Sequence, residues 1–147
     1  MFKKILVALD GSQPSQNALD AAIRLAEDYQ ADLLLFHVMQ MPIPADKFES
    51  LSGKLGSLYY QLKEQIEGFA ARLFQEATSK CASHSIKWQK RAVWGDPAGE
   101  IIKEACNGNY DLIVIGSRGL DDVENWLLGS VSQRVVRRSK CPVLVIR

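Results

Sequence analysis

The stretch that decides the fold is residues 110–136, YDLIVIGSRGLDDVENWLLGSVSQRVV. An apolar run ends at Gly116, Gly119 follows after two residues, and after nine more Gly129 and Ser130 open a segment with helical periodicity. Glycine lets an anion approach the backbone closely, and a helix N-terminus supplies unpaired N–H groups and a positive dipole end. Each feature taken singly also fits a plain strand end, turn or helix cap, but their combination with a long connecting loop favours a phosphate site.

The rest of the chain alternates apolar runs with helical periodicity, which is typical of a doubly wound α/β fold with an all or mostly parallel five-stranded sheet. Continuous apolar runs such as KILVAL and DLLLFHV suit strands that are covered on both faces. At 147 residues, the chain is expected to form a single domain, residues 1–147. We predict strands at 4–9, 32–38, 86–93, 111–115 and 142–146, the third at a sheet edge, and helices at 12–30, about 58–79, 97–107 and 129–138.

The second expected helix carries an apolar stripe that we expect to pack against the sheet. The stripe consists of Leu62, Ile66, Phe69, Ala70, Leu73 and Ala77.

In such sheets ligands bind beyond the carboxyl ends of the strands, at the point where the strand order reverses. The candidate segments are therefore those after the first, second and fourth strands, which contain Asp10, Val38 and Gly116. For Asp10, two roles are about equally favoured. Its carboxylate could accept hydrogen bonds from a ribose or help to place a metal ion, or it could simply stabilise the start of the following helix.

Composition excludes several classes of protein. Lys and Arg number 18 against 17 Asp and Glu, and they are scattered, so the basic footprint of a nucleic-acid binder is missing. The apolar runs are far shorter than the roughly 20 residues that a membrane span needs, and the first is too short for a signal peptide. We therefore expect a cytoplasmic protein that binds neither nucleic acid nor membrane. The three widely spaced cysteines indicate neither a disulfide framework nor a zinc site.

No catalytic constellation can be assembled from the sequence. Ser117 follows a strand, but G-S-R-G is not the G-x-S-x-G elbow, and His37 and His84 lie upstream of it. We expect both histidines to be core or surface residues. A binding protein is therefore favoured over an enzyme, with slow turnover of a bound ligand left open.

Whole-chain features resemble the universal stress protein family, specifically its ATP-binding branch. They are KKILVALDGS, LLLFHV, WGDP, DLIVIGSRG, LLGSVSQRVV and CPVLVIR. The motif G-x2-G-x9-G-[ST] is matched by Gly116, Gly119, Gly129 and Ser130. The resemblance implies a Rossmann-like fold, similar to adenine nucleotide alpha hydrolases, with strand order 3-2-1-4-5. It also implies a homodimer formed through the last strand, which begins at Pro142 and ends at Ile146.

The resemblance further implies a bound ATP, or ADP or AMP, accompanied by Mg²⁺ or Mn²⁺ held mainly through the phosphates, with Asp10 as a possible ligand. The N–H groups at the start of the last helix and the Ser130 hydroxyl would hold the terminal phosphates. The implied adenine contacts are Ala8, Leu9, Asp10 and Val38, and the implied ribose and phosphate contacts are Asp10, Ile115, Gly116, Gly119, Gly129, Ser130, Val131 and Ser132.

Two functions follow as hypotheses. The first is an ATP-binding homodimeric stress protein, in which nucleotide alters a surface read by an unknown protein partner. The alternative is a dimeric interaction module with a vestigial pocket, favoured by the acidic residues Asp121, Asp122 and Glu124 near the expected triphosphate. An adenylate-transferring or ATP-pyrophosphatase enzyme is disfavoured, because S-G-G-x-D-S is absent after the first strand.

Overall fold

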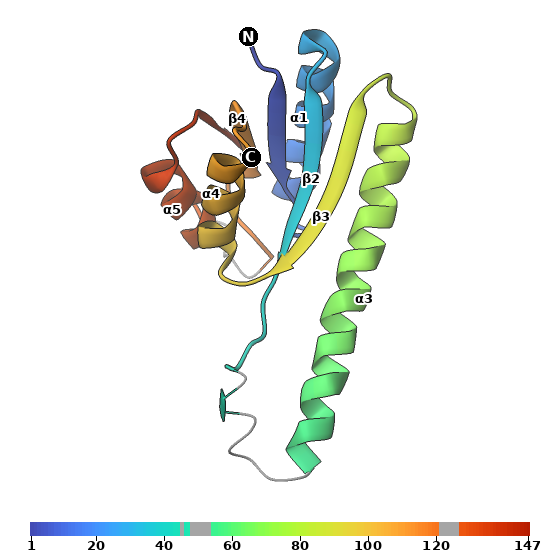
Figure 1. Cartoon of the computed structure of the whole chain (residues 1–147), viewed down its shortest axis with the longest axis vertical. Helices are drawn as coiled ribbons and strands as arrows, with labels where there is room; N and C mark the ends of the chain where they lie inside the picture. Colours follow the sequence, from blue (N-terminus) through green and yellow to red (C-terminus); the bar gives the residue numbers. More distant parts are fainter. Residues whose placement is uncertain (45, 48–53, 121–126) are drawn as a thin grey trace.

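The computed structural model describes residues 1–44, 46–47, 54–120 and 127–147 (Figure 1). The predicted acidic loop residues Asp121, Asp122 and Glu124 lie outside the described residues. The described elements alternate along the chain as the sequence predicted. They are β1 (Lys4–Ala8), α1 (Gln13–Tyr29), β2 (Asp32–Met39), α3 (Lys54–Ala82), β3 (Lys87–Trp94), α4 (Pro97–Asn107), β4 (Leu112–Gly116), α5 (Ser130–Arg138) and β5 (Val143–Ile146).

The five strands form one sheet in the order β3-β2-β1-β4-β5, with every neighbouring pair parallel. The predicted α/β fold, the strand order and the edge position of β3 are therefore confirmed. The register places Leu6 of β1 between Leu34 of β2 and Ile113 of β4. All three side chains are almost fully buried, because helices cover both faces of the sheet.

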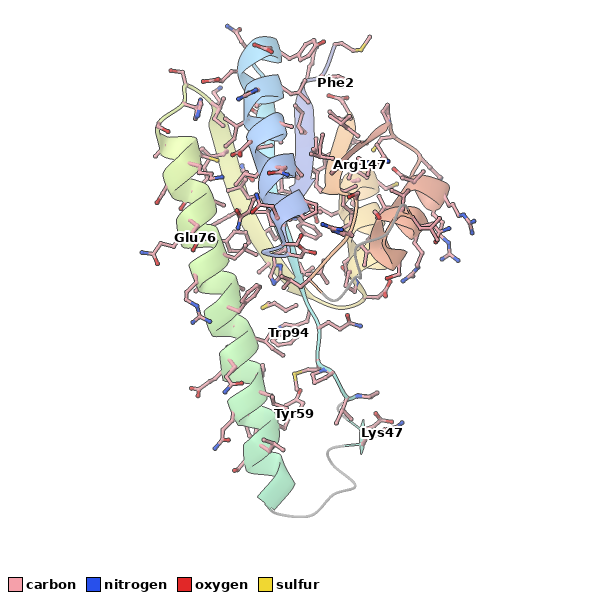
Figure 2. The ribbon with its side chains drawn as sticks, turned by 180° about the vertical axis from the view of Figure 1, so that it is seen from behind. Phe2, Lys47, Tyr59, Glu76, Trp94 and Arg147 are labelled. Atoms are coloured by element: carbon pink, nitrogen blue, oxygen red, sulfur yellow. The ribbon has the colours of Figure 1, made fainter. Side chains whose placement is uncertain are left out.

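Two apolar cores lie on opposite faces of the sheet. On one face, Ile5 and Leu33 pack with α1 and the C-terminal half of α3. On the other face, Leu6 and Phe36 pack with α4 and α5. Figure 2, seen from behind, shows α1 and α3 in front of the sheet, and Figure 1 shows α4 and α5 on the opposite side. No described helix is long and apolar enough to cross a membrane.

The starts of α1 and α4 follow from side-chain caps that the sequence indicated. Ser12 is the N-cap of α1, where its Oγ accepts a hydrogen bond from the Ser15 N–H at 3.3 Å. Asp96 is the N-cap of α4 and accepts from the Gly99 N–H at 2.9 Å. The hydrogen bonds from Arg134 of α5 and from Gly99 lower the pKa of Asp96. The α4 cap therefore also joins the two helices that cover one face.

The long helix α3 departs from its prediction in length and in packing. It begins at Lys54 rather than near residue 58, so that Gly56 lies within it. The prediction that its apolar stripe packs on the sheet is right for the C-terminal half, where Ala70 and Ala77 are buried. It is wrong for the preceding turns, because that half of α3 projects past the end of the sheet (Figure 1).

Candidate functional site

A cavity of about 550 Å³ lies at the carboxyl ends of β1, β2 and β4. This is the edge that parallel topology predicts for ligands, and the volume is within the usual range of small-molecule sites. Of the eleven residues predicted for the site, ten line this cavity, and only Gly129 does not. The ten are Ala8, Leu9, Asp10, Val38, Ile115, Gly116, Gly119, Ser130, Val131 and Ser132.

The N-terminus of α5 forms one end of the cavity. Its N-cap is Gly129, which offers no side-chain hydrogen bond, unlike the caps of α1 and α4. The first intrahelical bond of this turn runs from the Gln133 N–H to the Gly129 carbonyl at 2.9 Å. Helix geometry therefore leaves the N–H groups of Ser130 and Val131 without intrahelical acceptors. Together with the dipole, they make this end of the cavity suited to an anion.

The backbone N–H of Gly129, one of the residues predicted for the site, makes a hydrogen bond within the protein. That N–H donates to the Ser117 carbonyl at 2.7 Å. The buried Ser132 hydroxyl donates to the same carbonyl at 2.8 Å. These bonds join the end of β4 to the start of α5. Gly129 and the Ser132 hydroxyl thus hold the helix in place, while Ser130 and Val131 present their backbone to the cavity.

Asp10 stabilises the start of α1, which is one of the two roles expected for it. Its Oδ1 accepts hydrogen bonds from the Ser12 N–H at 2.9 Å and from the Ser12 hydroxyl at 2.5 Å. Its own N–H donates to the Ser15 hydroxyl at 3.0 Å. The turn between β1 and α1 is closed by Gly11 at φ 85°, a conformation that glycine adopts without strain. Asp10 also lines the cavity, so this bonding places its carboxylate at the site.

Gly116 is required by packing within the protein. A Cβ at this position would lie 2.8 Å from both the Pro14 carbonyl carbon and the Ser15 nitrogen. These are backbone atoms of the first turn of α1 and cannot rotate away. The sequence suggested that this glycine lets a ribose or phosphate approach the backbone. In the structure, the missing side chain lets the first turn of α1 pack against the end of β4.

The cavity offers few protein ligands to a divalent cation. The described residues contain no group of three or more His, Cys, Asp or Glu side chains that could hold a metal ion. Asp10 is the acidic side chain among the cavity-lining residues, and one of its oxygens is already bonded to Ser12. Mg²⁺ commonly binds through one or two carboxylates plus substrate phosphates. The described residues therefore fit a cation that is carried by a polyphosphate with at most one protein carboxylate.

His37 lies in the core, as the sequence led us to expect, but sequence reasoning missed its contact with the cavity and the whole contribution of α3. His37 is buried, with Nδ1 2.7 Å from the Leu9 carbonyl oxygen, and it lines the cavity as well as the core. From α3, Leu62, Ile66 and Phe69 line the cavity, and the Phe69 ring also lies 5.9 Å from the His37 ring of β2. The position of His37 next to Val38 was a usable signal. No local pattern shows that α3 extends past the sheet, because that depends on where the helix docks.

Comparisons with known proteins agree with this architecture. Residues 1–147 match the family described as "Universal stress protein family". The chain is 35% identical over 153 aligned residues to the universal stress protein YxiE of Bacillus subtilis, covering 100% of both chains. It also resembles the solved universal stress protein UspA from Lactobacillus plantarum, with a TM-score of 0.87, 25% identity and coverage of 99% and 98% of the two chains.

Two further solved structures contain adenine nucleotides. One is a universal stress protein in complex with cAMP, with a TM-score of 0.68, 26% identity and coverage of 99% and 97% of the two chains. The other is a universal stress protein family member from Arabidopsis thaliana with AMP bound, with a TM-score of 0.66 and coverage of 98% and 90%. At 21% identity, the Arabidopsis protein supports the fold alone.

Proposed function

The chain belongs to the universal stress protein family, and from that premise we propose that it is an ATP-binding homodimer that acts as a nucleotide-dependent switch in a stress response. ATP, or ADP or AMP after turnover, would occupy the cavity at the carboxyl edge of the sheet. Bound nucleotide would change a surface that a protein partner reads in the cytoplasm.

The observation that carries this proposal is the cavity, which combines an apolar wall with an anion-suited end. Ala8 and Val38 at the ends of β1 and β2 suit a flat base, and Ser130 and Val131 at the start of α5 suit phosphates. The cAMP complex of a relative supports an adenine nucleotide as ligand. The G-x2-G-x9-G-[ST] motif, by which the chain resembles the ATP-binding branch of the family, is the sequence reason for proposing ATP.

We propose at most slow hydrolysis. A fast ATPase needs a group that orients or deprotonates the attacking water. Among the described cavity residues, the two side chains that could do this already have partners in the protein. Nδ1 of His37 is bonded to the Leu9 carbonyl, and Oδ1 of Asp10 accepts from Ser12. Mg²⁺ or Mn²⁺ would screen the phosphate charge when bound, held mainly through the phosphates and from the protein by at most the Asp10 carboxylate.

The proposed dimer would form through the last strand, from Pro142 to Ile146. In the described sheet, β5 pairs with β4 on one side and lies at the edge on the other. Its residues are apolar, and Leu144 is 37% exposed. An exposed apolar edge strand is an aggregation hazard unless something covers it, and a second copy of the strand would do so. Sedimentation that yields the mass of one chain would refute the homodimer.

The direct test of nucleotide binding starts from the purified protein. The protein is denatured, and the released small molecules are separated by ion exchange beside nucleotide standards. We expect ATP or ADP at a ratio approaching one per chain, and titration of the nucleotide-free protein with MgATP should show saturable heat. If no nucleotide is released and MgATP gives no heat, the proposal is wrong.

That negative outcome would favour the second candidate, an interaction module with a vestigial pocket. The sequence observation behind it is the set of acidic residues Asp121, Asp122 and Glu124. Product formation at many turnovers per minute would instead indicate an enzyme.

A further inference from the structure

One wall of the cavity is not accounted for by the glycine motif or by the predicted contacts. It is formed by α3, from which Leu62, Gln65, Ile66 and Phe69 line the cavity. The three apolar members are half-buried, unlike Phe74 further along the helix, which is only 6% exposed. Apolar side chains held beside a cavity without being fully covered are available to a ligand with apolar faces.

The wall is anchored at its C-terminal end. A Cβ on Gly11 would lie 2.8 Å from the Phe69 ring, so this ring packs directly over the turn that carries Asp10. The centroids of the Phe69 and His37 rings are 5.9 Å apart. From Ala70 onward the helix is part of the core. Phe69 therefore marks the point where α3 leaves the sheet, and the turn that carries Leu62 and Ile66 projects beyond it.

The two ends of the cavity differ in chemistry and are separated across the sheet. Figure 1 shows α5 and α3 on opposite sides of the sheet, and Figure 2 shows the projecting half of α3, which carries Tyr59, continuing past Trp94. The α5 end offers backbone N–H groups at Ser130 and Val131, whereas the α3 end offers aliphatic and aromatic side chains. A nucleotide has the same polarity, with charge at the phosphates and an apolar π-face on the base.

We propose that Leu62, Ile66 and Phe69 of α3 form the base-holding wall of the site, so that a bound purine joins the projecting half of α3 to the end of the sheet. This inference rests on the proposed function and deepens it. It identifies base-positioning residues outside the glycine motif. It also makes the projecting half of α3, residues 58–69, the element whose stability responds to nucleotide.

The test separates base contacts from phosphate contacts by using two probes, MgATP and magnesium tripolyphosphate. Leu62→Ala and Ile66→Ala should each weaken MgATP binding about three- to tenfold, since each removes methyl and methylene contacts with the base. Tripolyphosphate, which has no base, should bind these variants as it binds the unaltered protein. The matched control is Leu58→Ala, which makes the same truncation one turn earlier, at a side chain that is 41% exposed and does not line the cavity.

Hydrogen exchange on the unaltered protein gives a second measurement that does not depend on any variant. MgATP should slow amide exchange more in residues 58–69 than in residues 70–82, which already pack on the core and gain only the general stabilisation that a ligand gives to the folded protein. Equal MgATP affinities for the Leu62, Ile66 and Leu58 variants, or unchanged exchange in residues 58–69 at saturating MgATP, would overturn this inference alone. Failure of the unaltered protein to bind MgATP would overturn the proposed function and this inference with it.

Discussion

The sharpest prediction concerns Ser130, the first residue of α5, whose exposed side chain lines the cavity. Replacing it with glutamate places a carboxylate where we expect phosphate. At about 5 Å, two unit charges repel by about 0.8 kcal/mol in water and about 3.3 kcal/mol at an effective dielectric constant of about 20. Each phosphate charge thus costs about 4-fold to 250-fold in affinity, and for a triphosphate we expect a loss of about 100-fold or more.

The same substitution should have the opposite effect on stability. A carboxylate in the first turn of a helix interacts favourably with the dipole, by about 0.3–1 kcal/mol. Thermal unfolding without nucleotide should therefore occur at an unchanged temperature or about 1–4 °C higher. Calorimetric titration with MgATP measures the loss of affinity, and a thermal melt measures stability.

Two variants separate charge from size and position. Ser130→Gln has nearly the shape of the glutamate variant without its charge, and it should bind MgATP far more tightly than Ser130→Glu. Gln133→Glu adds the same charge to the same helix at an exposed residue that does not line the cavity, and it should change affinity only a few-fold. If Ser130→Glu binds MgATP within threefold of the unaltered protein, α5 does not hold the phosphates and the reasoning is refuted.

Three further predictions concern stability and reactivity. Gly116→Ala should lower the free energy of unfolding by about 1–3 kcal/mol, because the methyl group meets the α1 backbone. Gly56→Ala should raise it by about 0.5–1 kcal/mol, because among the described residues no atom lies within 4 Å of the new Cβ. Denaturant melts that show equal effects for the two variants would contradict this packing argument. Burial raises the pKa of the Cys81 thiol to about 11. Alkylation at pH 8 should therefore modify the exposed Cys106 first and Cys81 only after unfolding. If mass spectrometry finds equal alkylation rates at the two cysteines, Cys81 is not buried as described. The backbone N–H groups of Lys3 and Lys4 donate to the Asp111 carboxylate and lower its pKa. Asp111→Asn should therefore lower the melting temperature by roughly 2–5 °C at pH 7. The difference in melting temperature between this variant and the unaltered protein should shrink as the pH falls below about 4 and through the depressed pKa of the folded state, because the carboxylate becomes protonated. A difference that stays constant down to pH 2 would point to a cause other than the carboxylate charge.

Most of the fold was predictable because its signals are local. The run Leu33 to Phe36 is apolar without interruption, as a strand buried on both faces requires, and the structure places β2 at Asp32–Met39. Asp96 followed by proline marks the start of α4, and Gly108 lies at its end. The lateral order of the strands is different, since periodicity carries no information about neighbours in a sheet. That order came from the family resemblance.

The predicted start of α3 falls too late in the chain, because glycine disfavours helix and Gly56 lies in the first turn. Gly56 costs the helix about 1 kcal/mol relative to alanine, which a 29-residue helix tolerates. The projecting half of α3 escaped prediction for a related reason. Leu62 and Ile66 have the spacing of a sheet-packing stripe, and only the docked position of the helix shows that no sheet lies beneath them.

The location of the candidate site was predictable from topology, whereas the tasks of its residues were not. The rule that ligands bind beyond the strand ends selected Asp10, Val38 and Gly116, and the structure brings all three to one cavity. The hydrogen bond from the Gly129 N–H to Ser117 joins positions twelve residues apart around a loop. Such a contact leaves no trace in residue type or spacing.

The contact between Gly116 and α1 bears on how family members should be compared. A relative that lost its nucleotide but kept its fold would still be selected to keep glycine there, because a side chain would displace α1. Retention of this glycine therefore cannot distinguish a working pocket from a relic. Ser130 is free of that packing constraint, since its side chain is exposed. Replacement of Ser130 by a bulky or acidic residue would be the mark of a lineage that no longer binds nucleotide.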